Sequence, residues 1–163
     1  MSIIQPLLKL DYKFNTFALL TELDRYKLSI GPYVDKRYGV VDNFKILRGD
    51  TSLRVMYQEC EKFLDYYGFA RSDGEPRYYI LKGNTKLPVH TDMDTKCSIN
   101  HLLEGTAPIH FPDIGDYEYS TALLDISKPH GVDNTNLPDR LLYKISFFNH
   151  TFEEVKSKIM NRQ

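Results

Sequence analysis

The sequence has few cysteines and no long apolar run, and each of these absences excludes a class of protein. Two cysteines, Cys60 and Cys97, are too few for a disulfide framework and have no partner at zinc-finger spacing, so we expect reduced, buried thiols. No run approaches the roughly 18 apolar residues of a membrane span, and the N-terminus lacks a signal-peptide pattern. These absences predict a cytoplasmic protein that does not insert into a membrane.

An excess of charge of one sign is also absent. The chain has 21 Lys and Arg against 22 Asp and Glu, without long blocks of like charge, which disfavours a dedicated nucleic-acid binder. Hydrophobic residues make up 42% of the 163 residues, which is enough for the packed core of one domain. We therefore expect a single domain over residues 1–163, for which nucleic acid is a disfavoured partner.

Helical periodicity is clear in two N-terminal segments and at the C-terminus. Apolar residues recur at helical spacing over residues 16–27 and 51–67, whereas residues 30–49 between them predict a long surface loop. A last helix is expected over residues 151–161, because Thr151 and Glu154 occupy capping-box positions. Asn15 or Thr16 would cap the start of the first helix. Asp50 would cap the start of the second helix, and Gly68 would end it.

Beyond Gly68 the pattern changes to short β-type runs separated by turn residues. Closely spaced strands of this kind predict a sandwich or barrel, with the jelly roll among the possibilities. The expected strands are residues 77–82, 87–92, 97–103, 107–111, 118–126, 128–132 and 140–148.

His90 and Asp92 are separated by one residue in the stretch LPVHTDMD. Alternate residues of a strand share a face, so an imidazole and a carboxylate would converge on one spot. Asp94 continues the alternation, and we interpret it as a turn residue or a supporting group. Such a pair can be a metal site, an acid/base pair or a solvated strand face.

His130 and Arg140 extend this pair. Both belong to β-type segments joined by a short loop, which predicts a hairpin that places them on neighbouring strands. Two histidines and a carboxylate are the ligands of the facial triad that holds non-haem Fe(II) and leaves positions open. An arginine nearby offers a planar fork for a carboxylate. His101 and His110 are the alternatives to His130 as the second histidine.

In His90-Thr91-Asp92, His130 and Arg140 the sequence resembles the Fe(II)- and 2-oxoglutarate-dependent dioxygenases, in particular the prolyl and aspartyl/asparaginyl hydroxylases. Their motif is His-x-Asp, a distant His and an Arg roughly ten residues later. The resemblance covers about residues 78–148. It implies a mainly β fold with flanking helices, a double-stranded β-helix of the jelly-roll or cupin-like type. The core would span about residues 69–148, after a helical part over residues 1–68.

The resemblance also implies an activity. His90, Asp92 and His130 would be the catalytic metal ligands of Fe(II), and Arg140 would pair with the far carboxylate of the co-substrate 2-oxoglutarate. With O2 as oxidant, the implied reaction is hydroxylation of an amino acid side chain, free or in a peptide or protein.

Further contacts to the co-substrate are expected from neighbouring segments. The family implies a tyrosine before the metal motif, here Tyr79 or its neighbour Tyr78. We add Asn100 of the next strand as a candidate, and Lys96, which precedes that strand, as a further possible contact to an acid group. Two other interpretations of the same fold remain. One is a cupin-like protein that binds a metal or a small molecule without oxygenase activity, and the other is an interaction module with an unused metal site.

Overall fold

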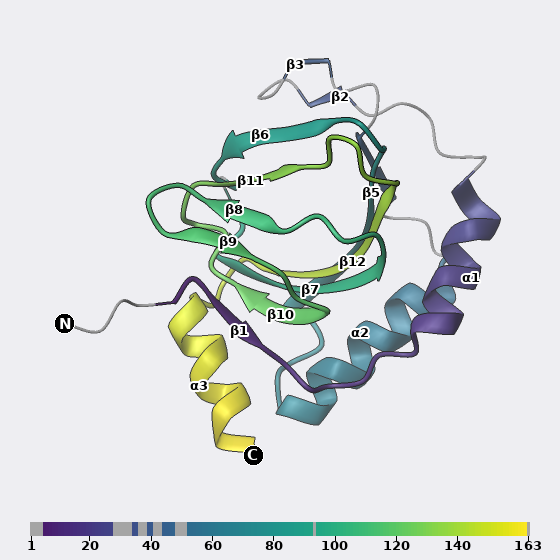
Figure 1. Ribbon diagram of the computed structural model, residues 1–163. Coiled ribbons are helices and arrows are strands. Elements are labelled where there is room, and N and C mark those ends of the chain that lie inside the picture. The colour runs from purple at the N-terminus through teal and green to yellow at the C-terminus, as the bar shows by residue number, and fades with distance from the viewer. Residues whose placement is uncertain are drawn as a thin grey trace.

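The computed structural model describes residues 5–27, 34–35, 39–40, 44–47, 52–92 and 94–162. Most of the strands form two antiparallel sheets that face each other, and the helices pack outside the larger sheet (Figure 1). The predicted fold class, mainly β with flanking helices in a jelly-roll arrangement, is confirmed.

Ten strands of the described residues make up the two facing sheets. The larger sheet has the order β1 (Leu7–Lys9), β10 (Thr121–Leu124), β7 (Cys97–Glu104), β12 (Arg140–Phe147), β5 (Gly74–Leu81) and β4 (Phe44–Leu47). The smaller sheet has the order β6 (Lys86–His90), β11 (His130–Asp133), β8 (Ile109–Phe111) and β9 (Gly115–Tyr117). A separate pair consists of β2 (Val34–Asp35) and β3 (Gly39–Val40).

The structure differs from three expectations about the arrangement of segments. Residues 1–68 are not only helical, because β1 and β4 extend the larger sheet, and the expected loop over residues 30–49 contains β2, β3 and β4; its other residues lie outside the described part. His130 and Arg140 are not on paired strands either, since β11 pairs with β6 and β8 whereas β12 pairs with β5 and β7. The connection between them crosses from one sheet to the other.

The helices begin and end close to the predicted residues, as α1 (Thr16–Tyr26), α2 (Arg54–Tyr67) and α3 (Phe152–Arg162). The Asn15 side chain caps α1 by accepting a hydrogen bond from Ala18 N. Gly68 ends α2 in the left-handed region at φ 76°, where a residue without a side chain is favoured. The predicted cap Asp50 lies outside the described residues.

Glu22 of α1 supplies the cap that α2 lacks within its own segment. Leu53 precedes α2 and makes no side-chain capping bond, whereas the buried Glu22 carboxylate accepts from Val55 N at 2.8 Å and Met56 N at 2.9 Å. The Tyr78 hydroxyl donates to the same carboxylate at 2.8 Å. A single side chain therefore joins both helices to β5.

Strand β12 shows how the larger sheet separates two environments. Leu141, Tyr143, Ile145 and Phe147 belong to a core cluster that also contains residues of all three helices. Alternate residues point the other way, toward the space between the sheets. Lys144 accordingly reaches Asp92, which follows β6 of the smaller sheet. The helical layer thus rests on an apolar core, and the inner face of β12 carries polar groups.

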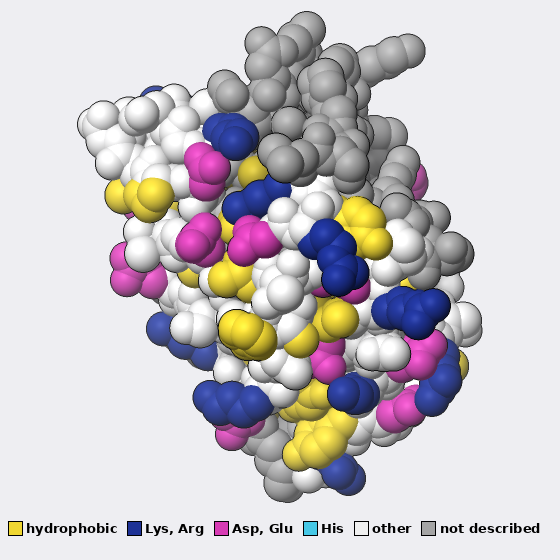
Figure 2. Space-filling view, turned by 90° about the vertical axis from the view of Figure 1, so that its right-hand side faces the viewer, with side chains coloured by type: hydrophobic (Ala, Val, Ile, Leu, Met, Phe, Trp, Pro, Cys, Tyr) yellow, Lys and Arg dark blue, Asp and Glu magenta, His cyan; other side chains and the backbone are white. Residues whose placement is uncertain are grey.

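The described surface carries charges of both signs. On the face shown in Figure 2, the described Lys and Arg side chains lie among Asp and Glu side chains and form no continuous patch. Among the residues that the structure describes, no helix combines the length and apolar character that crossing a bilayer requires.

Cys60 and Cys97 are free and buried as predicted, and burial raises the pKa of each thiol to about 12.

Candidate metal centre

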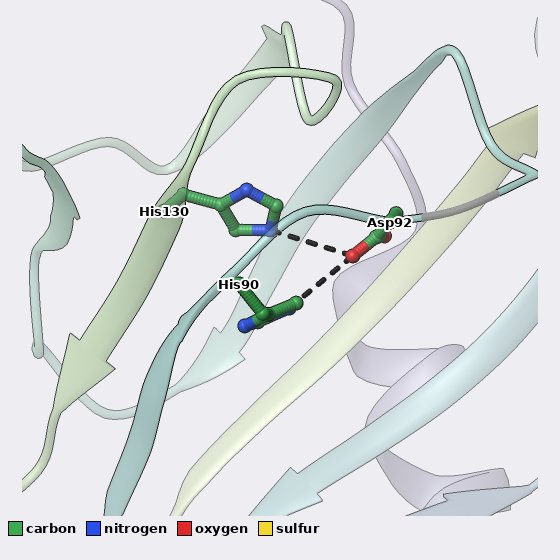
Figure 3. Close-up of side chains that lie close together, drawn as sticks. All are labelled: His90, Asp92 and His130. Atoms are coloured by element: carbon green, nitrogen blue, oxygen red, sulfur yellow. Dashed lines mark ion pairs between the residues drawn. The ribbon is translucent and has the colours of Figure 1, made fainter. Parts of the chain in front are cut away.

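Three side chains at one end of the smaller sheet converge, as Figure 3 shows. His90 ends β6 and His130 begins β11, and the two residues are direct partners in the antiparallel register. Asp92 lies after the end of β6 rather than within it, and its backbone N donates to Ile126 O. The expected alternation along one strand is therefore wrong in detail, but pairing of two strands brings the same residues together.

The distances suit ligands of one ion. Asp92 Oδ1 lies 3.2 Å from His90 Nε2 and 3.6 Å from His130 Nε2. One ligand atom from each of the three residues lies within 4.8 Å of the others, which is the spacing of atoms around a shared metal. Two imidazole nitrogens and one carboxylate oxygen are the donor set of the facial triad. The residues present therefore fit a ferrous ion.

The far nitrogen of each imidazole ring is held by the backbone. His90 Nδ1 donates to Pro88 O at 2.7 Å, and His130 Nδ1 donates to Lys128 O at 2.8 Å. A bond of this kind fixes the tautomer, so that each Nε2 carries its lone pair toward the other ligands. The backbone thus orients both histidines for coordination.

Asp92 is partnered by a cation that the sequence did not suggest. Lys144 Nζ lies 3.2 Å from Asp92 Oδ2. Burial alone would raise the pKa of the Asp92 carboxyl, but the Lys144 ammonium and the neighbouring imidazoles of His130 and His90 together hold this pKa well below its usual range. The carboxylate is therefore ionised at neutral pH, as a metal ligand must be.

Arg140 is a second buried cation on the same face of β12. Its guanidinium donates from Nη2 to the Tyr119 hydroxyl at 2.8 Å and from Nε to Ala107 O at 3.3 Å. Within the described residues it makes no ion pair with a carboxylate, although only 6% of its surface is exposed. A buried guanidinium with neutral partners favours binding of an anion.

Two other predicted contact residues face the same space. Tyr79 is paired in register with Leu142, between the positions of Arg140 and Lys144, and the Lys144 ammonium lies 5.0 Å from its ring centroid. Asn100 is paired with Lys144 and donates to the Tyr119 hydroxyl at 3.2 Å. The structure therefore places Tyr79 and Asn100 beside the two cations.

The remaining candidates lie elsewhere. Tyr78 points to the helical layer and bonds Glu22, which leaves Tyr79 as the tyrosine that faces the triad side of the sheet. Lys96 and Asp94 are exposed. His110 faces Asp116 on the exposed side of the smaller sheet, beside a hollow of about 360 Å³ that includes no triad residue. None of these residues joins the triad.

His101 is buried on the helical side of the larger sheet. Its Nε2 lies 2.8 Å from Thr16 Oγ1 and its Nδ1 2.7 Å from Thr121 Oγ1, and Phe14 packs against the ring. Burial lowers the pKa of His101 to about 4, although Glu59 opposes this shift. This histidine is therefore a neutral structural group and does not compete with His130.

The lowered pKa of His101 predicts a pH-dependent stability. His101 takes up a proton near pH 6.5 in the unfolded chain but only near pH 4 in the folded protein. Its contribution to the free energy of unfolding is therefore fully present above pH 6.5 and is lost as the pH decreases toward 4. We expect a loss of about 3 kcal/mol across this window. Urea unfolding of the wild type and His101→Gln between pH 7 and 4.5 measures the difference, with His110→Gln as the exposed control. The same pH slope in wild type and His101→Gln would contradict the assignment.

The arrangement of the two sheets is that of a double-stranded β-helix of the cupin-like jelly-roll type. A crystal structure of a prolyl-4-hydroxylase from Pseudomonas putida is similar, with a TM-score of 0.57 and 16% identity over 83% of this chain and 86% of that chain. At this identity the likeness shows the fold. No protein-family model and no curated protein matches the sequence.

Two other solved structures show weaker likenesses. A salicylate 1,2-dioxygenase from Pseudaminobacter salicylatoxidans matches with a TM-score of 0.45 and 13% identity over 92% of this chain, which spans 35% of that chain. An RmlC-like cupin protein from Desulfovibrio desulfuricans matches with a TM-score of 0.37 and 21% identity over 45% of this chain and 72% of that chain. Scores this low carry no functional argument.

Proposed function

We propose that this chain is an Fe(II)- and 2-oxoglutarate-dependent oxygenase that hydroxylates an amino acid side chain, free or in a peptide or protein. One observation carries the proposal: the triad of His90, Asp92 and His130 lies in the same interior as a buried arginine, Arg140, that has only neutral partners. A metal with open positions and a separate guanidinium are together suited to a 2-oxo acid with a second carboxylate.

The positions of the residues support a role for each in the proposed reaction. His90, Asp92 and His130 would hold Fe(II), which with 2-oxoglutarate and O2 supplies the oxidising chemistry while the co-substrate is converted to succinate and CO2. Arg140 would bind the far carboxylate of the co-substrate, oriented by its bond to Tyr119. Tyr79 and Asn100 would line the space between the two ends of this acid.

The test is anaerobic titration with Fe(II) and then 2-oxoglutarate, followed by the visible charge-transfer band of the chelated 2-oxo acid. We expect the band in the wild type and a requirement for about a hundredfold more 2-oxoglutarate in Arg140→Met, because a buried charge pair contributes about 3 kcal/mol to binding. Pyruvate has no second carboxylate, so its affinity should be the same in both proteins. Arg71→Met is the control, since Arg71 is an exposed, ion-paired arginine.

The alternatives give different results. A cupin-like binder without oxygenase activity would bind Fe(II) but show no band at any 2-oxoglutarate concentration, and Arg140 would be dispensable. An interaction module with an unused site would not be stabilised by Fe(II) or Mn(II) at all. Either result would overturn the proposed function.

A further inference from the structure

The two oxygens of Asp92 have different partners. Oδ1 faces His90 Nε2 and His130 Nε2, at 3.2 and 3.6 Å. Oδ2 instead lies 3.2 Å from Lys144 Nζ. The side of the carboxylate that faces the histidines is thus distinct from the side that faces the ammonium.

Lys144 is held in this position by its surroundings. It lies in the middle of β12, paired in register with Arg77 on one side and Asn100 on the other, and 9% of its side chain is exposed. Its ammonium also lies 5.0 Å from the centroid of the Tyr79 ring. A buried ammonium without an anion is costly, so the bond to Oδ2 is retained whenever both groups are charged.

We propose that Lys144 is a positioning residue that occupies Oδ2 of Asp92 and thereby restricts Asp92 to a single bond to the metal, through Oδ1. The inference rests on the proposed function. Carboxylates bind divalent cations through one oxygen or through both. A facial triad needs its remaining positions for a chelating acid and O2, and a second carboxylate oxygen would occupy one of them. Lys144 therefore keeps a position free without touching the metal.

The proposal predicts opposite changes in two affinities. In Lys144→Met the Oδ2 oxygen is released and a positive charge near the metal is removed, so Mn(II) should bind about tenfold more tightly. 2-Oxoglutarate should then bind the Mn(II) protein about tenfold more weakly, because it competes with Oδ2 for a position. A purely structural loss would weaken both affinities, so the opposite signs distinguish the two roles.

Both affinities can be measured by anaerobic calorimetry, first with Mn(II) and then with 2-oxoglutarate. The visible absorption spectrum of the Co(II) protein reports coordination independently, and it should differ between wild type and Lys144→Met before any acid is added. Lys144→Arg keeps a cation and should restore the wild-type order of affinities. Lys86→Met removes an exposed lysine, ion-paired with Asp133, and is the matched control.

The outcomes are separable. If Lys144→Met had the same Mn(II) affinity, the same 2-oxoglutarate affinity and the same Co(II) spectrum as the wild type, this inference would be overturned. The proposed function would then stay intact. Failure of the wild type to bind Mn(II) would overturn the proposed function, and the inference with it. Lys144→Gln lacks the charge and the reach of lysine, and it should give the same opposite changes if Lys144→Met does not fold.

Discussion

Replacement of His130 by alanine is expected to abolish the stabilisation of this protein by divalent metal. His130 provides one of three ligand atoms, and the two that remain, from His90 and Asp92, are too few to hold the ion at micromolar concentrations. At a hundredfold excess over its dissociation constant, Mn(II) should stabilise the wild type by about 2.7 kcal/mol. Thermal unfolding with and without Mn(II) measures this difference, which should vanish in the variant.

His110→Ala is the matched control for this prediction. His110 is a histidine of the same sheet, on the strand next to His130, but it faces Asp116 on the exposed side. This variant should respond to Mn(II) like the wild type. If His130→Ala kept the full response, the metal would be bound elsewhere and the triad would not be its site.

Replacement of Glu22 by alanine is expected to give the largest loss of stability. Three donors, Val55 N, Met56 N and the Tyr78 hydroxyl, would lose their acceptor at once. A buried unsatisfied donor costs about 1–3 kcal/mol, so we expect a decrease of about 4 kcal/mol in the free energy of unfolding. Urea unfolding at pH 7 measures it.

Two milder variants, Tyr78→Phe and Glu22→Gln, test the bonds to the Glu22 carboxylate. Tyr78→Phe removes one donor together with its bond to the carboxylate, and should cost only about 1 kcal/mol. Glu22→Gln keeps the shape but brings an amide N–H group against backbone donors, so its loss should be intermediate. The Mn(II) affinity of all three should stay at the wild-type value, because Glu22 lies on the helical side of the larger sheet. A Glu22→Ala protein within 1 kcal/mol of the wild type would show that water replaces the carboxylate.

Local patterns were sufficient to predict the helices and the triad. Helix α2 has an apolar stripe and a glycine at its end, and both signals depend only on neighbours in sequence. His90, Asp92 and His130 were chosen by residue type and order, which the structure translates into proximity. The roles of these residues remain a prediction.

Contacts between distant segments could not be predicted in this way. Lys144 is the one charged residue among the mostly apolar residues that follow Arg140 in β12, and its role depends on Asp92, which lies across the interior. The capping of α2 by Glu22 likewise requires the packing of one helix on another. The hairpin expected for His130 and Arg140 was wrong, because consecutive strands of a jelly roll can belong to opposite sheets.

This division between sheets has a consequence for substrate choice under the proposed function. The metal ligands belong to the smaller sheet and the segment that follows β6, whereas Arg140 belongs to the larger sheet. An acid that bonds to both must bridge the two walls of the jelly roll. The distance between the two sheets therefore limits the length of the acid that can make both contacts. Core residues that set this separation would select the co-substrate without ever touching it.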